Sequence, residues 1–551
     1  MDANFKRKSD ALSHKSHKKF KQEKNLGRLN QDTYEYFSRI AEVLKGEIDD
    51  EEKEILAKNT LEQTEGIEVD VCNHTVAASI LERIIPYAPW SEIQRIADAM
   101  DQEMNRIKSS SESRVEEAII KEAGNRIRTA EKEEKETCLH YLNNKSNQLL
   151  QNFENDIWNL NINFAARTCL TVCSGYDAKT NNKTAISKII VKKFSKKLMK
   201  WPEIADNYYH ESISGFLQIL IYSLKAVSIK KCQKFVRFLM ENCFMKNDDN
   251  LPDTVSVEYF EDVPWSRLLE AIIDVASPEI QEEIYQKIFL NHIGTLILSK
   301  KGHFAVCKLI KSCSNKITFA NIVEGVKDKF IEIISANHFD ILHALSDACV
   351  NTGEKQGEFL KNLTTAVGCS SPNKERYLFL CVISMKTCDE VSTEVDVNVN
   401  LHGSLIVQNI FKFKKPQKFI EAALSLNIST LKRILTDAKG CHVTDAFFDS
   451  STVGAKSKDR LLNALKGHYI DLAVDKYGSR SFDVIWNYAN QKQRTLIISE
   501  LSRQVMKTSF GTIIALKIGL EKYIKDKCAW ERAYNSTNKT NKFVDNKSRS
   551  F

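Results

Sequence analysis

The sequence predicts an all-α fold in which short helical repeats stack into a solenoid, and three observations lead to this expectation. The 551-residue chain holds only 8 prolines and 19 glycines, whereas sandwiches and barrels need frequent turn residues. A chain of this length is too long for one ordinary compact core, so several domains or a repeat array are expected. From about residue 32 to about residue 530, one amphipathic helical pattern follows another, which favours the array.

The composition is that of a folded chain, and the charge is concentrated at the two ends. Apolar residues make up 42% and charged residues 27%, as in soluble domains. The net charge is +7. Eight basic against three acidic residues give +5 in residues 1–25, and four against one give +3 in residues 534–551. The remainder is therefore close to neutral, and a face there for a polyanion requires one-sided placement of charge.

The two ends are expected to lie outside the folded array. Residues 1–28 are polar, basic and without periodicity, so we expect a disordered basic arm, and residues 533–551 form a basic C-terminal tail. The clusters KRK and KKFK in the arm are typical of a nuclear or nucleolar import signal, although a solubilising tail has the same composition. The array itself is expected to span residues 29–532.

Several classes of protein are not expected. The longest apolar stretches, such as Phe216–Leu224, are far short of the roughly 20 residues that span a membrane. The 14 cysteines form no CxxC pair, so we expect reduced core thiols and no metal site. Phosphate-binding loops, HExxH zinc sites and GxSxG elbows are missing, which predicts neither an enzyme nor a cofactor.

A helical unit recurs along the chain. Its sharpest copy is DKYGSRSFDVIW, Asp475–Trp486, and ten or eleven similar frames can be counted. The frames are marked by Ala77, Glu112, Ala165, Ile213, Trp265, Gly302, a weak one at Phe339, Gly403, Gly440, Gly478 and Gly511. The last four markers are 37, 38 and 33 residues apart. Recurrence of one helical unit at such spacing indicates an α-solenoid.

Each frame reads small–x–y–apolar–apolar–z. On a helix, x and z lie one turn apart on one face, y lies beside them, and the apolar pair faces the core. We therefore expect x, y and z to face away from the core. Such a surface suits the bases of a single strand, because x and z can bind a base edge while y stacks on the ring.

These trios resemble the base-reading triads of Pumilio (PUF) repeats, which consist of three helices. In that family Ser-Arg with Glu is associated with guanine, since a carboxylate accepts two hydrogen bonds from the guanine edge and Arg stacks on the base. The matching trios are Ser266, Arg267 and Glu270; Ser113, Arg114 and Glu117; and, with a shorter acid, Ser479, Arg480 and Asp483.

Other frames keep only part of the pattern. The further candidates for RNA contact are Arg167 (in a frame with Ala166 and Leu170), Ser214 and Gln218, His303 and Phe304, Ser404 and Gln408, and His442 and Asp445. The trio Thr512, Ile513 and Leu516 is nearly apolar. This variation argues against one base read by every repeat.

Longer segments resemble the nucleolar protein 9 family. They are Leu29–Gly66, Leu170–Tyr176, Leu401–Phe413, Asp475–Trp486 and Gly519–Arg532. The resemblance implies a right-handed, C- or U-shaped solenoid of about eleven three-helix repeats, monomeric and nucleolar. It also implies binding of precursor rRNA in pre-ribosomal small-subunit particles, where the protein restrains premature cleavage during 18S rRNA maturation. The alternative is a protein-binding HEAT or armadillo scaffold or transport adaptor, but those arrays do not need Gly-Ser-Arg at the start of a helix.

Overall fold

The computed structural model describes residues 29–532, apart from four internal gaps at 103–108, 178–183, 246–255 and 394–397. The predicted arm and tail lie outside the described residues. The described residues form helices joined by turns, and no strand occurs among them. No helix in this part of the chain is long and apolar enough to cross a membrane.

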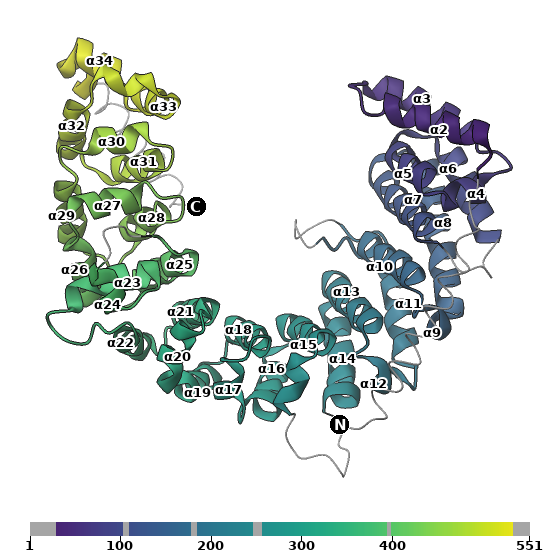
Figure 1. The fold of residues 1–551 in the computed structure, drawn as a ribbon, viewed down its shortest axis with the longest axis horizontal. Helices are drawn as coiled ribbons and strands as arrows, with labels where there is room; N and C mark the ends of the chain where they lie inside the picture. Colours follow the sequence, from purple (N-terminus) through teal and green to yellow (C-terminus); the bar gives the residue numbers. More distant parts are fainter. Residues whose placement is uncertain (1–28, 103–108, 178–183, 246–255, 394–397, 533–551) are drawn as a thin grey trace, which may run out of the picture. The chain divides into compact units, whose positions relative to one another are not determined.

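The chain packs into two compact units. Unit 1 comprises Met1–Leu251 and Asp262–Ser277, and unit 2 comprises Pro252–Glu261 and Pro278–Phe551. Each unit repeats one element order, namely a short first helix, a second helix that carries the x–y–z frame, and a third helix (Figure 1).

Unit 1 begins with two lead-in helices, α2 (Gln31–Val43) and α3 (Asp50–Glu62). Its first helices are α4 (Glu68–Asn73), α9 (Phe153–Asp156) and α12 (Ile204–Asn207). Its second helices are α5 (Thr75–Ile84), α7 (Ser110–Thr129), α10 (Leu160–Ser174), α13 (Glu211–Val227) and α15 (Val263–Val275). Its third helices are α6 (Trp90–Gln102), α8 (Lys132–Gln151), α11 (Lys188–Leu198) and α14 (Ile229–Leu239).

Unit 2 follows the same order. Its first helices are the short η4 (Val257–Glu261), α17 (Ile293–Leu296), α20 (Phe330–Ser335), α23 (Leu378–Ser384), α27 (Ile428–Leu435), α30 (Tyr469–Val474) and η8 (Arg503–Lys507). Its second helices are α18 (Gly302–Ser312), α21 (Phe339–Thr352), α25 (Leu401–Ile410), α28 (His442–Asp449), α31 (Gly478–Tyr488) and α33 (Ser509–Ile518). Its third helices are α16 (Pro278–Ile284), α19 (Lys316–Val326), α22 (Gln356–Ala366), α26 (Gln417–Leu424), α29 (Ala455–Ala464), α32 (Gln491–Glu500) and α34 (Leu520–Lys525). An extra helix, α24 (Cys388–Thr393), lies between α23 and α25.

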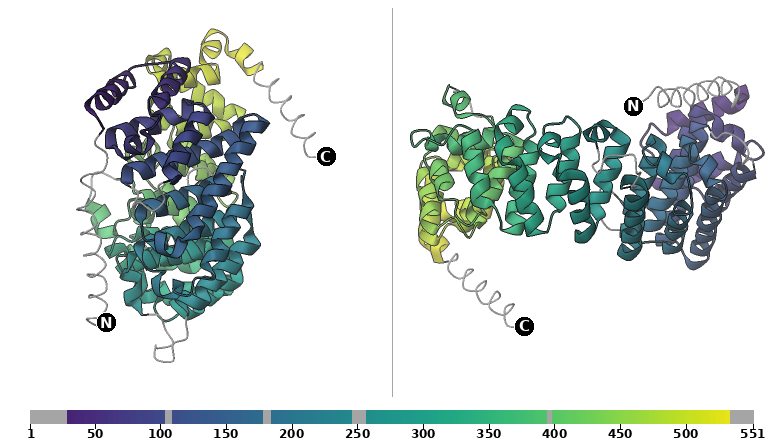
Figure 2. Two further views of the ribbon diagram at one scale, coloured as in Figure 1. Left: turned by 90° about the vertical axis from the view of Figure 1, so that its right-hand side faces the viewer. Right: turned by 90° about the horizontal axis from the view of Figure 1, so that it is seen from below.

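The second helices form one continuous layer within each unit. In unit 1, α5, α7, α10, α13 and α15 pack each against the next, and in unit 2 the same holds from α18 to α33. In unit 2 the third helices lie on the other side of the stack, as α26, α29 and α32 show in Figure 1, and the further views in Figure 2 show only helices in the coloured part of the chain. The described residues thus hold eleven second helices, which agrees with the expected number of repeats.

Capping and burial explain why these segments form helices. Asp262 starts α15 by accepting a hydrogen bond from the Trp265 amide at 2.8 Å, and Asn400 caps α25 in the same way. Such caps satisfy amide groups that have no partner inside the helix. The inward faces are apolar, and 13 of the 14 cysteines are buried among them, as expected for core thiols, with Cys528 exposed.

Glycine at the start of a second helix lets the first helix approach closely. A Cβ atom on Gly440 would overlap the backbone carbonyl oxygen of Ile434, the last residue but one of α27. A Cβ atom on Gly478 would lie 2.7 Å from the carbonyl oxygen of Leu472 in α30. The glycine and its contact are six residues apart in both repeats. These two frame markers are glycines because only hydrogen fits between the two backbones.

We predict that Gly440→Ala lowers the free energy of unfolding by about 1–3 kcal/mol, because the added methyl group forces α27 and α28 apart. The matched control is Gly454→Ala in the same unit, where a Cβ atom meets nothing within 4 Å and φ is −64°. Urea denaturation of both variants measures the difference. Equal midpoints for the two variants would contradict this account of the frame glycines.

Candidate nucleic-acid interface

The surface of the second-helix layer carries the frame residues. In α15, Leu268 and Leu269 are fully buried, Arg267 is exposed and Glu270 is half-buried, as the frame predicts for the apolar pair, y and z. Ser266, at x, is buried. The expectation that x also faces away from the core is therefore wrong, because x lies against the neighbouring second helix.

Three buried x serines, in α7, α13 and α25, make the same hydrogen bond to the next repeat. Their hydroxyl groups donate to the backbone carbonyl two residues before x of the next second helix. These bonds run from Ser113 to Asn161 at 2.9 Å, from Ser214 to Pro264 at 2.6 Å and from Ser404 to Lys439 at 2.8 Å. A buried hydroxyl needs such a partner, so x ties neighbouring repeats together and sets their register.

This bond identifies the true frame of α10. Asn163 is fully buried, and its Nδ2 donates to the carbonyl of Ser212 at 3.1 Å, two residues before Ser214. Asn163 is therefore x, Phe164 is y and Arg167 is z. The Phe164 side chain is 44% exposed, as suits a stacking residue.

The sequence-based frame of α10, with Ala166, Arg167 and Leu170, is wrong by three residues, since Ala166 and Leu170 are buried. The pair Ala165–Ala166 is the apolar pair of this repeat and not its start. An aromatic residue directly before two alanines was the signal that could have identified Phe164.

The frame marked by Phe339 in α21 is wrong by one residue. Ile341 and Leu342 are fully buried and form the apolar pair, so Asp340 lies at y and His343 at z. The sequence offers two apolar pairs here, Ile341–Leu342 and Ala344–Leu345, so it does not fix the frame by itself.

The y side chain of one helix lies against the z side chain of the preceding helix. The contacts are Arg114 Nε to Glu82 Oε1 at 3.4 Å, Cys307 Sγ to Asp340 Oδ2 at 3.1 Å, and Arg480 Nη2 to Asp445 Oδ2 at 3.2 Å. The two arginine pairs are partly exposed, and exposed pairs of this kind contribute about 0–1 kcal/mol. A ligand that offers better contacts can therefore separate them.

Arg167 occupies a different place from the expected one. Its Nη2 donates to the carbonyl of Ser212 at 2.9 Å, and its guanidinium lies over Gly215, the y position of α13. A Cβ atom at Gly215 would come within 2.5 Å of that nitrogen. Burial lowers the pKa of the Arg167 guanidinium. The guanidinium of Arg167 thus occupies the space that a side chain at Gly215 of the next repeat would fill.

The three guanine-type trios differ in their surroundings. Ser266 lies 3.5 Å from Glu270 Oε1 within one trio. Glu117 accepts a hydrogen bond from Thr168 of the next repeat at 3.0 Å, and Asp483 pairs with Lys517 at 2.8 Å. Both carboxylates are therefore shared with the following helix.

The two Ser–Gln frames are nearly identical. Gln218 and Gln408 each donate from Nε2 to the x serine of their own helix, Ser214 and Ser404, at 3.1 Å. Each amide is thereby held at the surface of its repeat, one in each unit.

The remaining candidates divide into exposed and buried side chains. Phe304 is 51% exposed and His442 is exposed, so both can meet a base. His303 is buried and donates from Nδ1 to the Ser299 carbonyl at 2.8 Å, so it serves as an x residue and not as a surface donor. At α33 the face becomes apolar, because Ile513 and Leu516 are 62% and 74% exposed.

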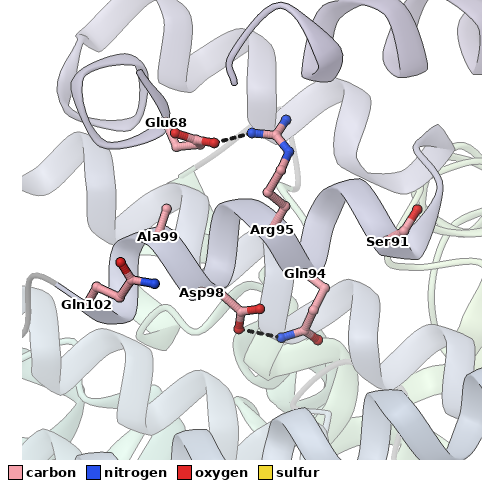
Figure 3. A pocket seen from close by; sticks show the side chains of 7 residues that line it. All are labelled: Glu68, Ser91, Gln94, Arg95, Asp98, Ala99 and Gln102. Atoms are coloured by element: carbon pink, nitrogen blue, oxygen red, sulfur yellow. Dashed lines mark hydrogen bonds and ion pairs between the residues drawn. The ribbon is translucent and has the colours of Figure 1, made fainter. Parts of the chain in front are cut away.

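A separate pocket lies along α6 in unit 1. Figure 3 shows the residues that line it: Glu68, Ser91, Gln94, Arg95, Asp98, Ala99 and Gln102. Arg95 is held by ion pairs to Glu68 and Glu92 and by a hydrogen bond to the Leu61 carbonyl. The positive charge of Arg95 is therefore compensated by two carboxylates of the protein. The residues that line the pocket include no paired nucleophile and base for catalysis.

One group of side chains in the described part of the chain could hold a metal ion. Cys369, Cys381 and Cys388 are buried, and their sulphur atoms all lie within 4.8 Å of one another. The expectation of no metal site rested on the absence of paired CxxC spacing, whereas these three cysteines are 12 and 7 positions apart.

The family follows from comparison with known proteins. The model of the NOP9-like PUF repeat domain matches residues 177–511. The chain belongs to the NOP9-like PUF repeat family. Nucleolar protein 9 of Mus musculus is 25% identical over 297 residues, 50% of this chain and 47% of that protein. Pumilio homolog 23 of Arabidopsis thaliana is 22% identical over 94% of this chain and 75% of its own length. The chain spans about half the length of the nucleolar protein 9 relatives that it matches first.

Solved structures confirm the PUF repeat fold of this NOP9-like chain. The structure titled APUM23-GGAAUUGACGG has a TM-score of 0.77 at 18% sequence identity and covers 92% of this chain and 100% of its own. The structure titled APUM23-GGAGUUGACGG has a TM-score of 0.71 at 19% identity, with the same coverage. The all-α repeat architecture predicted from frame spacing is therefore confirmed.

We predict that Ser404→Ala in this PUF array lowers the free energy of unfolding by about 1–3 kcal/mol, because the Lys439 carbonyl loses its buried partner. The control Ser79→Ala removes an exposed hydroxyl at a y position and should change stability little. Urea denaturation compares the two. If the exposed serine proves as costly as the buried one, x does not join neighbouring repeats.

Proposed function

We propose that this chain binds single-stranded RNA along the surface of its second-helix layer and acts as a binding protein of ribosome biogenesis rather than as an enzyme. The observation that carries the proposal is the contact of y with the preceding z, as in Arg114 with Glu82 and Arg480 with Asp445. It recurs in the same register in both units.

This register suits bases one repeat apart. A flat cation or aromatic ring at y can stack on a base, and the neighbouring z side chain can meet the base edge. Phe164, Phe304 and His442 offer rings at y, while Arg114 and Arg480 offer guanidinium groups. On RNA binding, each arginine exchanges its exposed carboxylate contact for a stacked base. The apolar y and z residues of α33 are not proposed to read a base.

The relatives support the class of ligand and the location. The titles of the structures of APUM23 name the RNA sequences GGAAUUGACGG and GGAGUUGACGG, and the mouse and human relatives are named nucleolar protein 9. By this kinship the chain is a nucleolar protein whose RNA is precursor rRNA. We further propose that it acts as a monomer on pre-ribosomal small-subunit particles and restrains premature cleavage during 18S rRNA maturation.

A protein-binding scaffold of HEAT or armadillo type is the alternative from the sequence. The family match over residues 177–511 argues against it. The frames of Gly440 and Gly478 do so as well, since they place the exposed side chains of His442 and Arg480 at y at the start of a helix.

RNA binding tests the proposal directly. We predict that the purified chain binds single-stranded RNA and that affinity falls at least about tenfold between 50 and 200 mM salt, as expected for three or more phosphate contacts. Filter binding with uniform RNA pools measures it. If the chain does not bind RNA, or if its RNA affinity does not change with salt concentration, the RNA-binding function is refuted and the protein-binding scaffold is favoured.

The trio of α15 provides the sharper test. Glu270→Ala removes acceptors for a guanine edge and should cost about 1–3 kcal/mol of binding free energy. Arg267→Ala removes a stacking partner and should cost a similar amount, about 1–3 kcal/mol. Thr512→Ala is the control at an apolar frame and should bind normally.

The melting temperature of each variant is measured together with its RNA affinity, because a change in fold would lower the RNA affinity indirectly. The Glu270→Ala variant should also lose its preference for guanine over adenine at one position of the RNA. Normal binding by Glu270→Ala and Arg267→Ala, at unchanged melting temperatures, would show that this trio does not read RNA.

A further inference from the structure

Three cysteines from three separate elements converge in unit 2. Cys369 lies just after the end of α22, Cys381 lies in the middle of α23, and Cys388 is the first residue of α24. All three are at most 2% exposed. They form the one candidate group of metal ligands in the described ranges, and no part of the proposed RNA face includes them.

The spacing of the sulphur atoms suits a zinc ion. Cys369 Sγ and Cys381 Sγ are 3.6 Å apart, and the third sulphur lies within 4.8 Å of both. Zinc binds thiolate sulphur at about 2.3 Å in tetrahedral geometry, which separates two sulphur ligands by about 3.8 Å. A movement of the Cys388 side chain by about 1 Å is therefore sufficient for three-sulphur coordination.

We propose that Cys369, Cys381 and Cys388 bind one zinc ion, with a water molecule as the fourth ligand. Each thiol releases its proton to solvent as its sulphur bonds to the metal. Zinc is favoured over magnesium and calcium because soft thiolates bind it preferentially. Its tetrahedral coordination needs four ligands, so one water molecule completes the set of three thiolates.

The surroundings act differently on the three thiols: the hydrogen bond with Cys369 raises the pKa of Cys381, and burial raises the pKa of Cys388. The hydrogen bond with Cys381 lowers the pKa of the Cys369 thiol, and the nearby Lys374 ammonium acts in the same direction. Three thiolates around Zn²⁺ carry a net charge of −1, and the Lys374 ammonium lies near Cys369. Lys374 itself is held by Asp389, the residue after Cys388, at 2.8 Å.

The position of the cluster gives the metal a structural role. The α24 segment interrupts the usual passage from first to second helix, and zinc would join it to α23 and to the end of α22. This passage leads to Gly403 in α25, which packs against the carbonyl groups of Val382 and Ile383 in α23. Residues 370–373 beside Cys369 are exposed and leave a short path for a metal ion.

The test uses the full chain, purified under reducing conditions without chelator and then titrated with zinc alone. We expect one zinc per chain and a melting temperature that falls when the metal is stripped. Cys388→Ser should weaken zinc binding by more than about 100-fold, beyond the 10–100-fold typical of losses around the ligands. Cys349→Ser, at another buried thiol of unit 2, is the matched control and should bind zinc as the wild type does.

A measurement on the wild type covers the case in which Cys388→Ser fails to fold. X-ray absorption at the zinc edge should report three sulphur ligands. Coordination by nitrogen and oxygen only, or zinc retained by the Cys388→Ser variant at wild-type affinity, would overturn the proposal. Recovery of a Cys369–Cys381 disulfide from the reduced, metal-loaded protein would also overturn it, since it would identify a redox pair.

Discussion

The hydrogen bond from a buried x side chain to the next second helix is the contact on which the rest of the surface depends. In α7, α10, α13 and α25 the donor is Ser113, Asn163, Ser214 or Ser404, and the acceptor is always the carbonyl two residues before the next x. A buried polar group has few acceptable partners, so this bond admits one register between neighbouring helices. With x directed inward, y is placed at the surface and z is placed beside the y of the following repeat.

This geometry explains how degenerate frames can share one surface. Where y is arginine, it rests on the preceding carboxylate, as Arg480 does on Asp445. Where y is glycine, as at Gly215, the Arg167 side chain of the preceding repeat occupies the space. The face therefore carries a flat or cationic group at α7, α10, α13, α15, α18, α28 and α31 although individual trios differ. The weak energy of exposed ion pairs leaves these groups available to a ligand.

The cysteines illustrate the difference between local and tertiary constraints. Most of them fill the apolar layer between helices, as Cys349 does in α21. Cys369, Cys381 and Cys388 have the same burial but meet at the one place where an extra helix interrupts a repeat. The contact of Gly403 joins α23 to α25 and does not include the inserted helix α24. That contact alone therefore does not fix the position of α24. The proposed metal bridge would hold the inserted helix in place, because it joins three segments at one point.

The sequence by itself determined the fold class, the repeat and the position of most frames. Glycine spacing at Gly440 and Gly478 and the apolar pair after y are local signals, since they follow from helix periodicity and from backbone approach within one repeat. The tertiary structure decided that x is buried, that α10 is framed by Asn163 and Phe164, and that three distant cysteines meet. Each of these depends on which neighbour a side chain faces. That information arises only when successive helices pack, because contacts between repeats leave no fixed spacing in the sequence.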